Sequence, residues 1–239
     1  MSHWWVTDAL KAGGPAYLSA WVIWVIVSIT LHELAHGWAA ISRGDSTPID
    51  TGHMTWNPLV HMGGMSLLVF AVTGIAWGLM PVTPSRMRGR HADAFVAVCG
   101  PLMNVALAAV CIMGTVVAVL ALSGATPTAQ NAELLKSFRI FFGVGCSLNV
   151  TLALFNLIPA PPLDGSRILA DFSHQYRSAL RSESGQFFGI AMFMVAFFFA
   201  GRLIGGVGIE AWIRGAGGML DVLHAIGVGP GSPWSGMRP

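Results

Sequence analysis

Long apolar stretches separated by short polar connections dominate this sequence. Four of them, residues 17–41, 94–122, 138–157 and 187–206, are long enough to cross a bilayer as helices, because a transmembrane helix needs about 20 mostly apolar residues. The pattern therefore predicts an all-α polytopic membrane protein with about four full transmembrane helices.

Two further regions are less regular. Residues 62–80 are apolar but contain four glycines, and two prolines follow, so this stretch either crosses the membrane or dips in and returns. Residues 43–61 are polar and rich in turn-forming residues, and the pieces 48–51 and 53–56 alternate in polarity. This alternation predicts a small β-hairpin.

The two ends of the chain differ from its centre. Residues 1–16 are mildly polar and contain two tryptophans, which suit a membrane interface. Apolar and charged positions mix at helical spacing over residues 209–226, which predicts an interfacial helix. The sequence then becomes rich in Gly, Pro and Ser, which is typical of disorder. We therefore divide the chain into an interfacial lead, one transmembrane domain over 17–208, and an interfacial helix with a disordered tail over 209–239.

The composition supports a membrane protein and narrows its chemistry. Hydrophobic residues make up 54% of the 239 residues and charged residues only 10%, whereas soluble domains carry about 25% charged residues. The net charge of +2 and the absence of a basic block argue against nucleic-acid binding.

The three cysteines lie in apolar stretches without a Cys-x-x-Cys pair, so we expect neither a disulfide framework nor a cysteine zinc site. The first apolar stretch is too long for a signal peptide, and we expect it to be retained.

One apolar stretch carries ionisable side chains. His32, Glu33 and His36 lie within residues 17–41 in the pattern His-Glu-Leu-Ala-His. Helix positions four apart share a face, so the two histidines can bind one metal ion, with Glu33 beside a metal-bound water. Each ionisable group costs about 2.5–3.5 kcal/mol at mid-membrane, which disfavours a pair of ordinary core histidines. The spacing is that of zinc hydrolases, in which the glutamate is the general base.

A catalytic zinc ion usually has three protein ligands, so a third must come from elsewhere. Glu133, Glu183 and Glu210 lie in loops or at a surface. Asp164 is the better candidate, because the prolines before it forbid a regular helix and irregular backbone at membrane depth must line a protein cavity. The alternative is that Asp164 caps a helix beginning at Gly165. The spacing alone gives these two interpretations equal weight.

Three motifs together resemble a known family. His-Glu-Leu-Ala-His in an apolar stretch, Gly-Pro-Leu-Met-Asn at 100–104 and Asn-Leu-Ile-Pro-Ala-Pro-Pro-Leu-Asp-Gly at 156–165 are similar to the motifs of site-2 proteases, the intramembrane zinc metalloproteases. The resemblance covers residues 17–169 and is closest to minimal bacterial members without PDZ or CBS domains. It implies zinc held by two histidines and Asp164, and a role for Asn156 in orienting the substrate. It also implies cleavage of single-pass transmembrane proteins.

The resemblance also implies a topology. In that family the end of the metal-motif helix and the start of the Gly-Pro-Leu-Met-Asn helix both lie on the cytosolic side, which requires an even number of crossings between them. We therefore predict that residues 62–80 re-enter from the cytosol without crossing, in agreement with the positive-inside rule. The protein would lie in the plasma membrane with its site nearer the cytosolic face. A substrate helix must unwind locally before it can be cleaved, and the hairpin within 43–61 would bind the unwound strand by pairing along its edge.

Other polar residues receive weaker assignments. We interpret Asn104 as a packing and hydrogen-bonding residue between helices, with Gly100 allowing close approach. His53, His61 and His91 are expected in loops, in solvated or supporting positions and not as ligands.

The alternative functions are a membrane metal-ion transporter and a non-proteolytic zinc-binding membrane protein. A transporter would show several carboxylates along a path, whereas this chain concentrates its candidate ligands, and a binding homologue would not need Glu33. A protease acting on soluble or prenylated peptides also fits the His-Glu-x-x-His motif.

Overall fold

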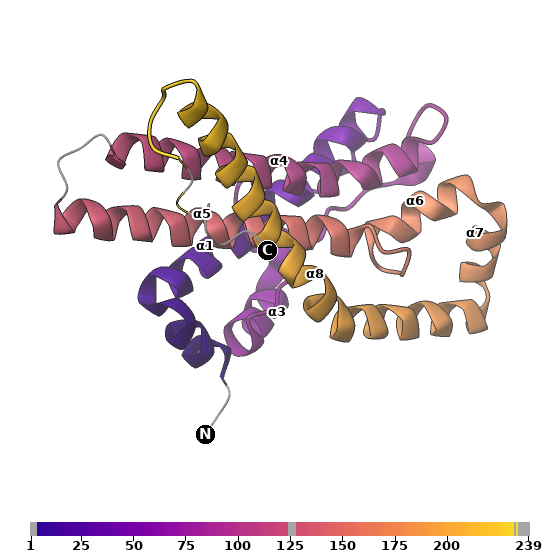
Figure 1. Ribbon diagram of the computed structural model, residues 1–239. Coiled ribbons are helices and arrows are strands. Elements are labelled where there is room, and N and C mark those ends of the chain that lie inside the picture. Colours follow the sequence, from indigo (N-terminus) through magenta and orange to yellow (C-terminus); the bar gives the residue numbers. More distant parts are fainter. Residues whose placement is uncertain (1–3, 124–127, 232, 234–239) are drawn as a thin grey trace.

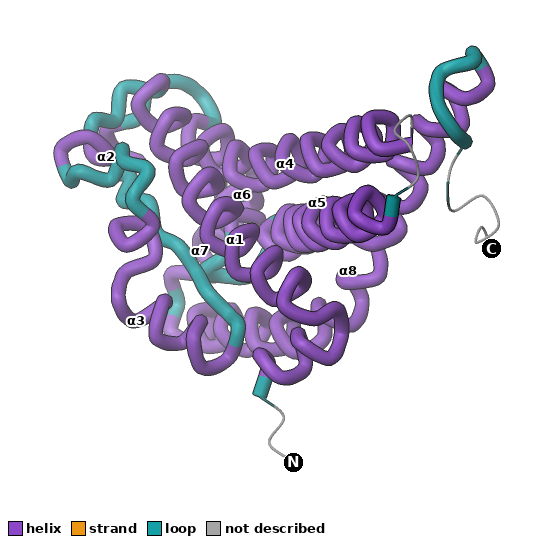
Figure 2. Tube along the Cα trace, turned by 90° about the vertical axis from the view of Figure 1, so that its left-hand side faces the viewer, coloured by secondary structure: helices purple, strands orange, loops and turns teal. Residues whose placement is uncertain are grey.

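The computed structural model describes residues 4–123, 128–231 and 233. Figures 1 and 2 show helices joined by loops, and no strand occurs among the described residues, which confirms the all-α class. The helices are α1 (Trp5–Ser42), α2 (Thr47–Asp50), α3 (Pro58–Thr73), the 3-10 turn η1 (Pro84–Arg86), α4 (Ala92–Ser123), α5 (Ala129–Asn156), α6 (Asp164–Phe172), α7 (His174–Arg181) and α8 (Glu183–Ala225).

The core forms where α1, α4 and α5 pack together, and Figure 1 shows α4 and α5 lying side by side. Trp24 of α1 is buried there, and its Nε1 donates a hydrogen bond to the carbonyl of Phe141 in α5 over 2.9 Å. Gly145 permits this approach, since a Cβ on it would lie 2.3 Å from the Trp24 ring. Small residues at helix contacts are the usual means of packing helices where lipid replaces water.

Three described helices are long and apolar enough to cross a membrane: Trp5–Ser42, Ala92–Leu122 and Ala129–Asn156. They contain the first two predicted spans and all of the third except its last residue, Leu157, and the chain is a multi-pass membrane protein. The fourth predicted span, 187–206, lies in α8, where the apolar helix Phe187–Phe199 is shorter.

The predicted interfacial helix 209–226 is the second half of α8 and not a separate element. Trp212 donates a hydrogen bond from Nε1 to Oγ1 of Thr115 in α4 over 2.8 Å, and Leu220 is completely buried against α4. One side of this half, with Trp212, Ala216 and Leu220, therefore packs against other helices, while Ile209, Val222 and Ile226 are exposed. Part of the predicted tail, residues 232 and 234–239, lies outside the described residues.

The predicted β-hairpin within residues 43–61 is wrong. Residues Thr47–Asp50 form a helical turn instead, with Pro48 in its first turn, where the fixed φ of proline favours a helix start. The side chain of Asp45 accepts a hydrogen bond from the backbone N–H of Thr47 over 3.0 Å. These local contacts use backbone donors that a hairpin would need for its ladder.

Residues 62–80 run outward and return. The helix α3 ends at Gly74, which adopts a left-handed conformation with φ of 77°, a position where glycine is the usual helix terminator. The chain then continues as an extended stretch, residues 75–83, here called the returning segment (Figure 2). Near this tip, Trp5 at the start of α1 donates a hydrogen bond to the carbonyl of Ala71 over 3.1 Å.

Hydrogen bonds hold the returning segment against α3. The Ser66 hydroxyl donates to the carbonyl of Trp77 over 2.7 Å and accepts from the N–H of Trp77 over 2.9 Å. Further along, the N–H of Leu79 donates to the carbonyl of His61 over 2.9 Å. Both ends of this apolar stretch therefore lie next to each other, which is the path expected of a re-entrant segment.

Asp45 fixes the far end of the returning segment. Its Oδ2 accepts a hydrogen bond from the N–H of Thr83 over 2.6 Å, while Oδ1 accepts from the hydroxyl and the N–H of Thr47. Burial alone would raise the pKa of Asp45, but these hydrogen bonds outweigh it and hold the pKa below its usual range.

We expect Asp45→Asn to destabilise the protein by about 2 kcal/mol at pH 7, because a charge-assisted hydrogen bond to Thr83 is lost. A carboxyl group whose pKa is lowered by folding stabilises the folded state above its unfolded pKa of about 3.9, and this contribution disappears as the pH falls further. Thermal unfolding in detergent should therefore show a difference between wild type and variant at pH 7 that shrinks below about pH 4. Asp50→Asn, at an exposed ion pair with Arg86, is the control. A difference independent of pH would contradict this role.

Candidate metal centre

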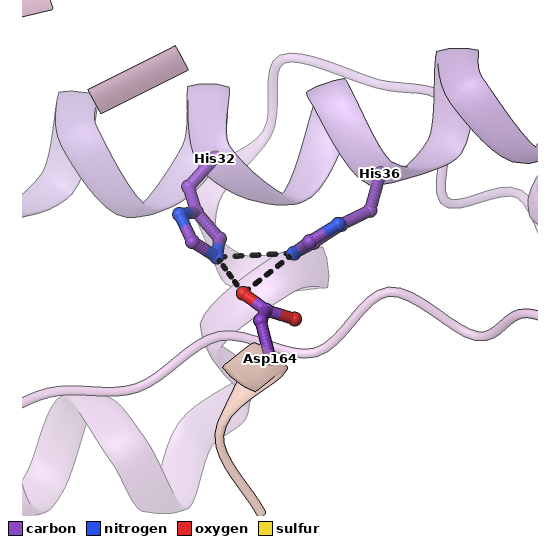
Figure 3. A group of neighbouring side chains, drawn as sticks. All are labelled: His32, His36 and Asp164. Carbon is purple, nitrogen blue, oxygen red and sulfur yellow. Dashed lines mark hydrogen bonds and ion pairs between the residues drawn. The ribbon is translucent and has the colours of Figure 1, made fainter. Parts of the chain in front are cut away.

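Two histidines of α1 and the first residue of α6 point at one another in the interior (Figure 3). His32 and His36, one helical turn apart, bring their Nε2 atoms to 3.0 Å from each other. Oδ2 of Asp164 lies 3.2 Å from Nε2 of His32 and 3.3 Å from Nε2 of His36. All three side chains are buried, so the three predicted ligands come together.

The hydrogen bonds on the far side of each ring show which nitrogens face the centre. Nδ1 of His32 lies 2.6 Å from Oδ1 of Asn104, and Nδ1 of His36 lies 2.8 Å from the carbonyl oxygen of Val96. Because both partners are oxygen acceptors, each Nδ1 carries a proton, and in the neutral form of each ring the lone pair of Nε2 then points inward.

Two nitrogen lone pairs and one carboxylate oxygen therefore converge without a donor between them. Oδ2 of Asp164 is buried and has no hydrogen-bond partner, although both histidine nitrogens are within ion-pair distance. Buried acceptors facing one another repel, and a cation bound between them would relieve this repulsion.

The donor set and its dimensions fit zinc. Zinc binds histidine nitrogen at about 2.0–2.1 Å and carboxylate oxygen at about 2.0–2.2 Å, so ligand atoms around a tetrahedral ion lie about 3.3 Å apart. The three separations here are 3.0, 3.2 and 3.3 Å. Among the described residues this is the only group of three or more His, Cys, Asp or Glu side chains that could hold a metal ion.

The backbone before α6 delivers Asp164 to the histidines. The loop 157–163 folds back so closely on Gly165 that a Cβ there would lie 2.2 Å from the carbonyl oxygen of Leu157. Asp164 is the first residue of α6, and the residue before it, Leu163, provides no side-chain cap. The alternative interpretation, in which Asp164 caps a helix beginning at Gly165, is therefore not what the structure shows.

Helix α4 forms one wall of the centre. A Cβ on Gly100 would lie 2.4 Å from Nε2 of His36 and 2.6 Å from Nε2 of His32, so only glycine allows the rings this position. Gly100 was predicted to allow two helices to approach closely. In the structure it is the rings of His32 and His36 that lie against Gly100. The predicted hydrogen-bonding role of Asn104 between helices is confirmed, because it contacts His32 in α1 and Asn149 in α5.

Glu33 is buried beside the cluster and faces the returning segment. A Cβ on Gly78 would lie 2.6 Å from Oε1 of Glu33, so the segment passes directly over this carboxylate. The sequence did not mark Gly78 as part of the site. A glycine in an apolar stretch was the only signal, and glycines are common in membrane-embedded helices for reasons of packing alone.

The structure does not bring Asn156 into the cluster. It is the last residue of α5, and its side-chain amide donates to the carbonyl of Leu152 in the same helix over 3.0 Å. Its predicted role in orienting a substrate stays a prediction.

The remaining predicted histidines lie outside the metal cluster, as expected. His61 was expected in a loop, but it belongs to α3 and is almost completely buried. Its Nε2 lies 2.7 Å from the carbonyl oxygen of Thr55. His91 pairs with Asp171 at 3.0 Å. His53 contacts its own loop.

The family of this chain follows from comparison with known proteins. Residues 112–200, which include Asp164, match the profile of Peptidase family M50. YwhC of Bacillus subtilis, whose name describes it as an inferred zinc metalloprotease, is 34% identical to this chain over 183 residues. The matched region covers 74% of this chain and 78% of YwhC. The chain belongs to peptidase family M50. It is an intramembrane zinc metalloprotease, and the resemblance to site-2 proteases is confirmed.

Two further relatives, each 30% identical, are also named as inferred zinc metalloproteases. Rip2 of Mycolicibacterium smegmatis is 30% identical over 147 residues, covering 59% of this chain and 52% of the relative. MJ0611 of Methanocaldococcus jannaschii is 30% identical over 138 residues, covering 58% of this chain and 62% of the relative. No solved structure matches this chain significantly.

If Asp164 completes the zinc site, purified wild-type M50 peptidase should contain about one zinc per chain and Asp164→Ala should lose most of it, because two histidines alone hold zinc weakly. Metal analysis of the detergent-purified proteins measures this directly. Asp50→Ala, which removes an exposed carboxylate, should retain the metal. Unchanged zinc in Asp164→Ala would reject Asp164 as a ligand.

Proposed function

We propose that this M50 peptidase hydrolyses a peptide bond within or near the transmembrane helix of a membrane-anchored protein. In this proposal His32, His36 and Asp164 hold the zinc ion and Glu33 is the general base. The observation that carries it is the convergence of three buried ligand atoms beside a buried glutamate. This arrangement suits metal-assisted hydrolysis.

Zinc bound by these residues supplies Lewis acidity, which lowers the pKa of water toward about 7 and polarises the scissile carbonyl. Glu33 accepts the proton of the attacking water on its carboxylate and returns it to the leaving amine. The histidines need no further proton, because each is held by an acceptor at Nδ1. Gly78 and the returning segment cover Glu33 and limit the access of bulk solvent to it.

The returning segment is a suitable place for an unwound substrate. Its Trp77 and Leu79 hydrogen-bond toward α3, so the backbone groups of Ala76, Gly78 and Met80 face the other edge. No hydrogen-bond partner within the described part of the chain occupies that edge. A substrate strand would pair there, next to Glu33, by β-augmentation. This replaces the predicted hairpin within 43–61 as the docking edge.

A transmembrane helix has its carbonyls in hydrogen bonds, so it must unwind locally before one of them can be attacked. We therefore expect substrates with Gly, Pro, Asn or Ser near the cleaved bond, since these residues weaken a helix.

The transporter alternative receives less support. A transport path needs several metal-binding positions along the membrane, whereas the described residues contain a single cluster of this type.

Glu33→Gln should lower the cleavage rate by about 10²–10⁴-fold, because glutamine cannot accept the proton, while zinc content stays at the wild-type level. The test co-reconstitutes the protein with tagged single-pass substrates that carry Gly or Pro in the membrane and follows their cleavage products. Glu133→Gln, at an exposed carboxylate, is the matched control. Cleavage at the wild-type rate by a zinc-loaded Glu33→Gln protein would remove Glu33 from the role of base.

We further propose that the protein lies in the plasma membrane with its site nearer the cytosolic face. Residues 62–80 would then enter and leave on that face, supported by the adjacency of Leu79 and His61 and by the arginines of residues 86–90. Single cysteines at Ala76 and Ser85 should react with impermeant thiol reagents from the cytosolic face only. Labelling of either position from outside would contradict this topology.

A further inference from the structure

A chain of hydrogen bonds leads from the metal centre into the core and crosses three helices. Nδ1 of His32 in α1 lies 2.6 Å from Oδ1 of Asn104 in α4. Nδ2 of Asn104 donates to Oδ1 of Asn149 in α5 over 2.9 Å, and Nδ2 of Asn149 donates to the backbone carbonyl of Gly145 over 2.9 Å. Both asparagines are completely buried.

The last member of this chain fixes the direction of all the others. A backbone carbonyl can only accept, so Asn149 must turn its NH₂ group toward Gly145 and its oxygen toward Asn104. Asn104 must then present its NH₂ to Asn149 and its oxygen to His32. Facing an oxygen, His32 carries its proton on Nδ1 and keeps the lone pair of Nε2 free.

His36 shows why this extended arrangement is needed at only one ligand. Its Nδ1 faces the backbone carbonyl of Val96. A backbone carbonyl is always a hydrogen-bond acceptor, so it needs no further residue to orient it. His32 instead faces a side-chain amide, which presents a donor or an acceptor after a half turn. Without a second partner, Asn104 could turn its NH₂ to His32 and draw the ring proton to Nε2, where it would block the metal.

We propose that Asn149 is a positioning residue of the metal centre, which orients Asn104 and thereby holds His32 in the tautomer that can bind metal. It touches neither the metal position nor Glu33 and acts only through Asn104. The proposal rests on the zinc site of the proposed function, but the tautomer of His32 is a property of the protein without metal and can be observed independently.

The test compares Asn149→Leu, which preserves the size of the side chain and removes its hydrogen bonds, with wild type. Apparent zinc affinity is measured by chelator competition on the full-length protein in detergent. Partners that orient a metal ligand typically contribute about 10–100-fold to metal affinity, and we expect a loss in this range. If the leucine variant does not fold, Asn149→Ala removes the same amide and should act in the same direction.

A second substitution makes the expectation specific. In Asn104→Asp the carboxylate accepts from Nδ1 of His32 in either orientation, so Asn149 is no longer needed. Adding Asn149→Leu to this background should change zinc affinity by less than about threefold, compared with the loss of about 10–100-fold in the wild-type background. Equal losses in both backgrounds would overturn the proposal.

Thr115→Val is the matched control, because it removes another buried hydrogen bond between helices, from Trp212 of α8 to Thr115 of α4. It should lower thermal stability without changing zinc affinity. Nitrogen-15 spectra of histidine-labelled, metal-free protein report the tautomer directly. We expect protonated Nδ1 at His32 in wild type and Thr115→Val, and a mixture in Asn149→Leu.

An unchanged tautomer together with unchanged affinity in Asn149→Leu would also overturn the proposal. Failure of the wild type to bind zinc would count instead against the zinc site, while the spectra of the metal-free protein would still decide the role of Asn149.

Discussion

The mutual repulsion of three buried acceptors is the constraint around which this protein is built. His32, His36 and Asp164 turn lone pairs toward one point inside a bundle of apolar helices. Each is positioned by a contact outside the cluster. Nδ1 of His32 faces the side-chain amide of Asn104, Nδ1 of His36 faces the backbone carbonyl of Val96, and the tight loop 157–163 positions Asp164. The helices α1, α4 and α5 and the loop before α6 must keep their positions for these atoms to converge.

The same constraint explains the distribution of glycine around the centre. Gly100 makes room for the two rings, Gly78 for Glu33 and Gly165 for the loop that carries Asp164. In each case a methyl group would lie well within van der Waals contact of a catalytic side chain or of the backbone. These glycines are therefore required by the space they leave free, and none of the three relies on an unusual backbone conformation.

Much of this arrangement was accessible from the sequence, where the determining interactions are local. The spacing of His32 and His36 is a property of one helix. The apolar stretches identify the long helices without any knowledge of how these helices pack. Asp164 required the family resemblance, because local rules leave metal binding and helix capping equally weighted. The predicted hairpin was wrong because four alternating residues are too few to outweigh Pro48 and the side chain of Asp45. Asn149 carried no local signal, since its role exists only when α4 and α5 pack side by side.

The attachment of the returning segment has a consequence for the metal centre. Trp5 holds the turn before the segment through Ala71, and Asp45 holds its far end, while a break at Gly13 and Gly14 separates Trp5 from the part of α1 that carries the histidines. The carboxylate of Glu33, the edge beside it and two of the three metal ligands therefore all belong to residues 5–83, which these contacts tie together. The third ligand, Asp164, is carried by α6, which packs against α4, so two separate parts of the chain must meet before the metal centre is complete.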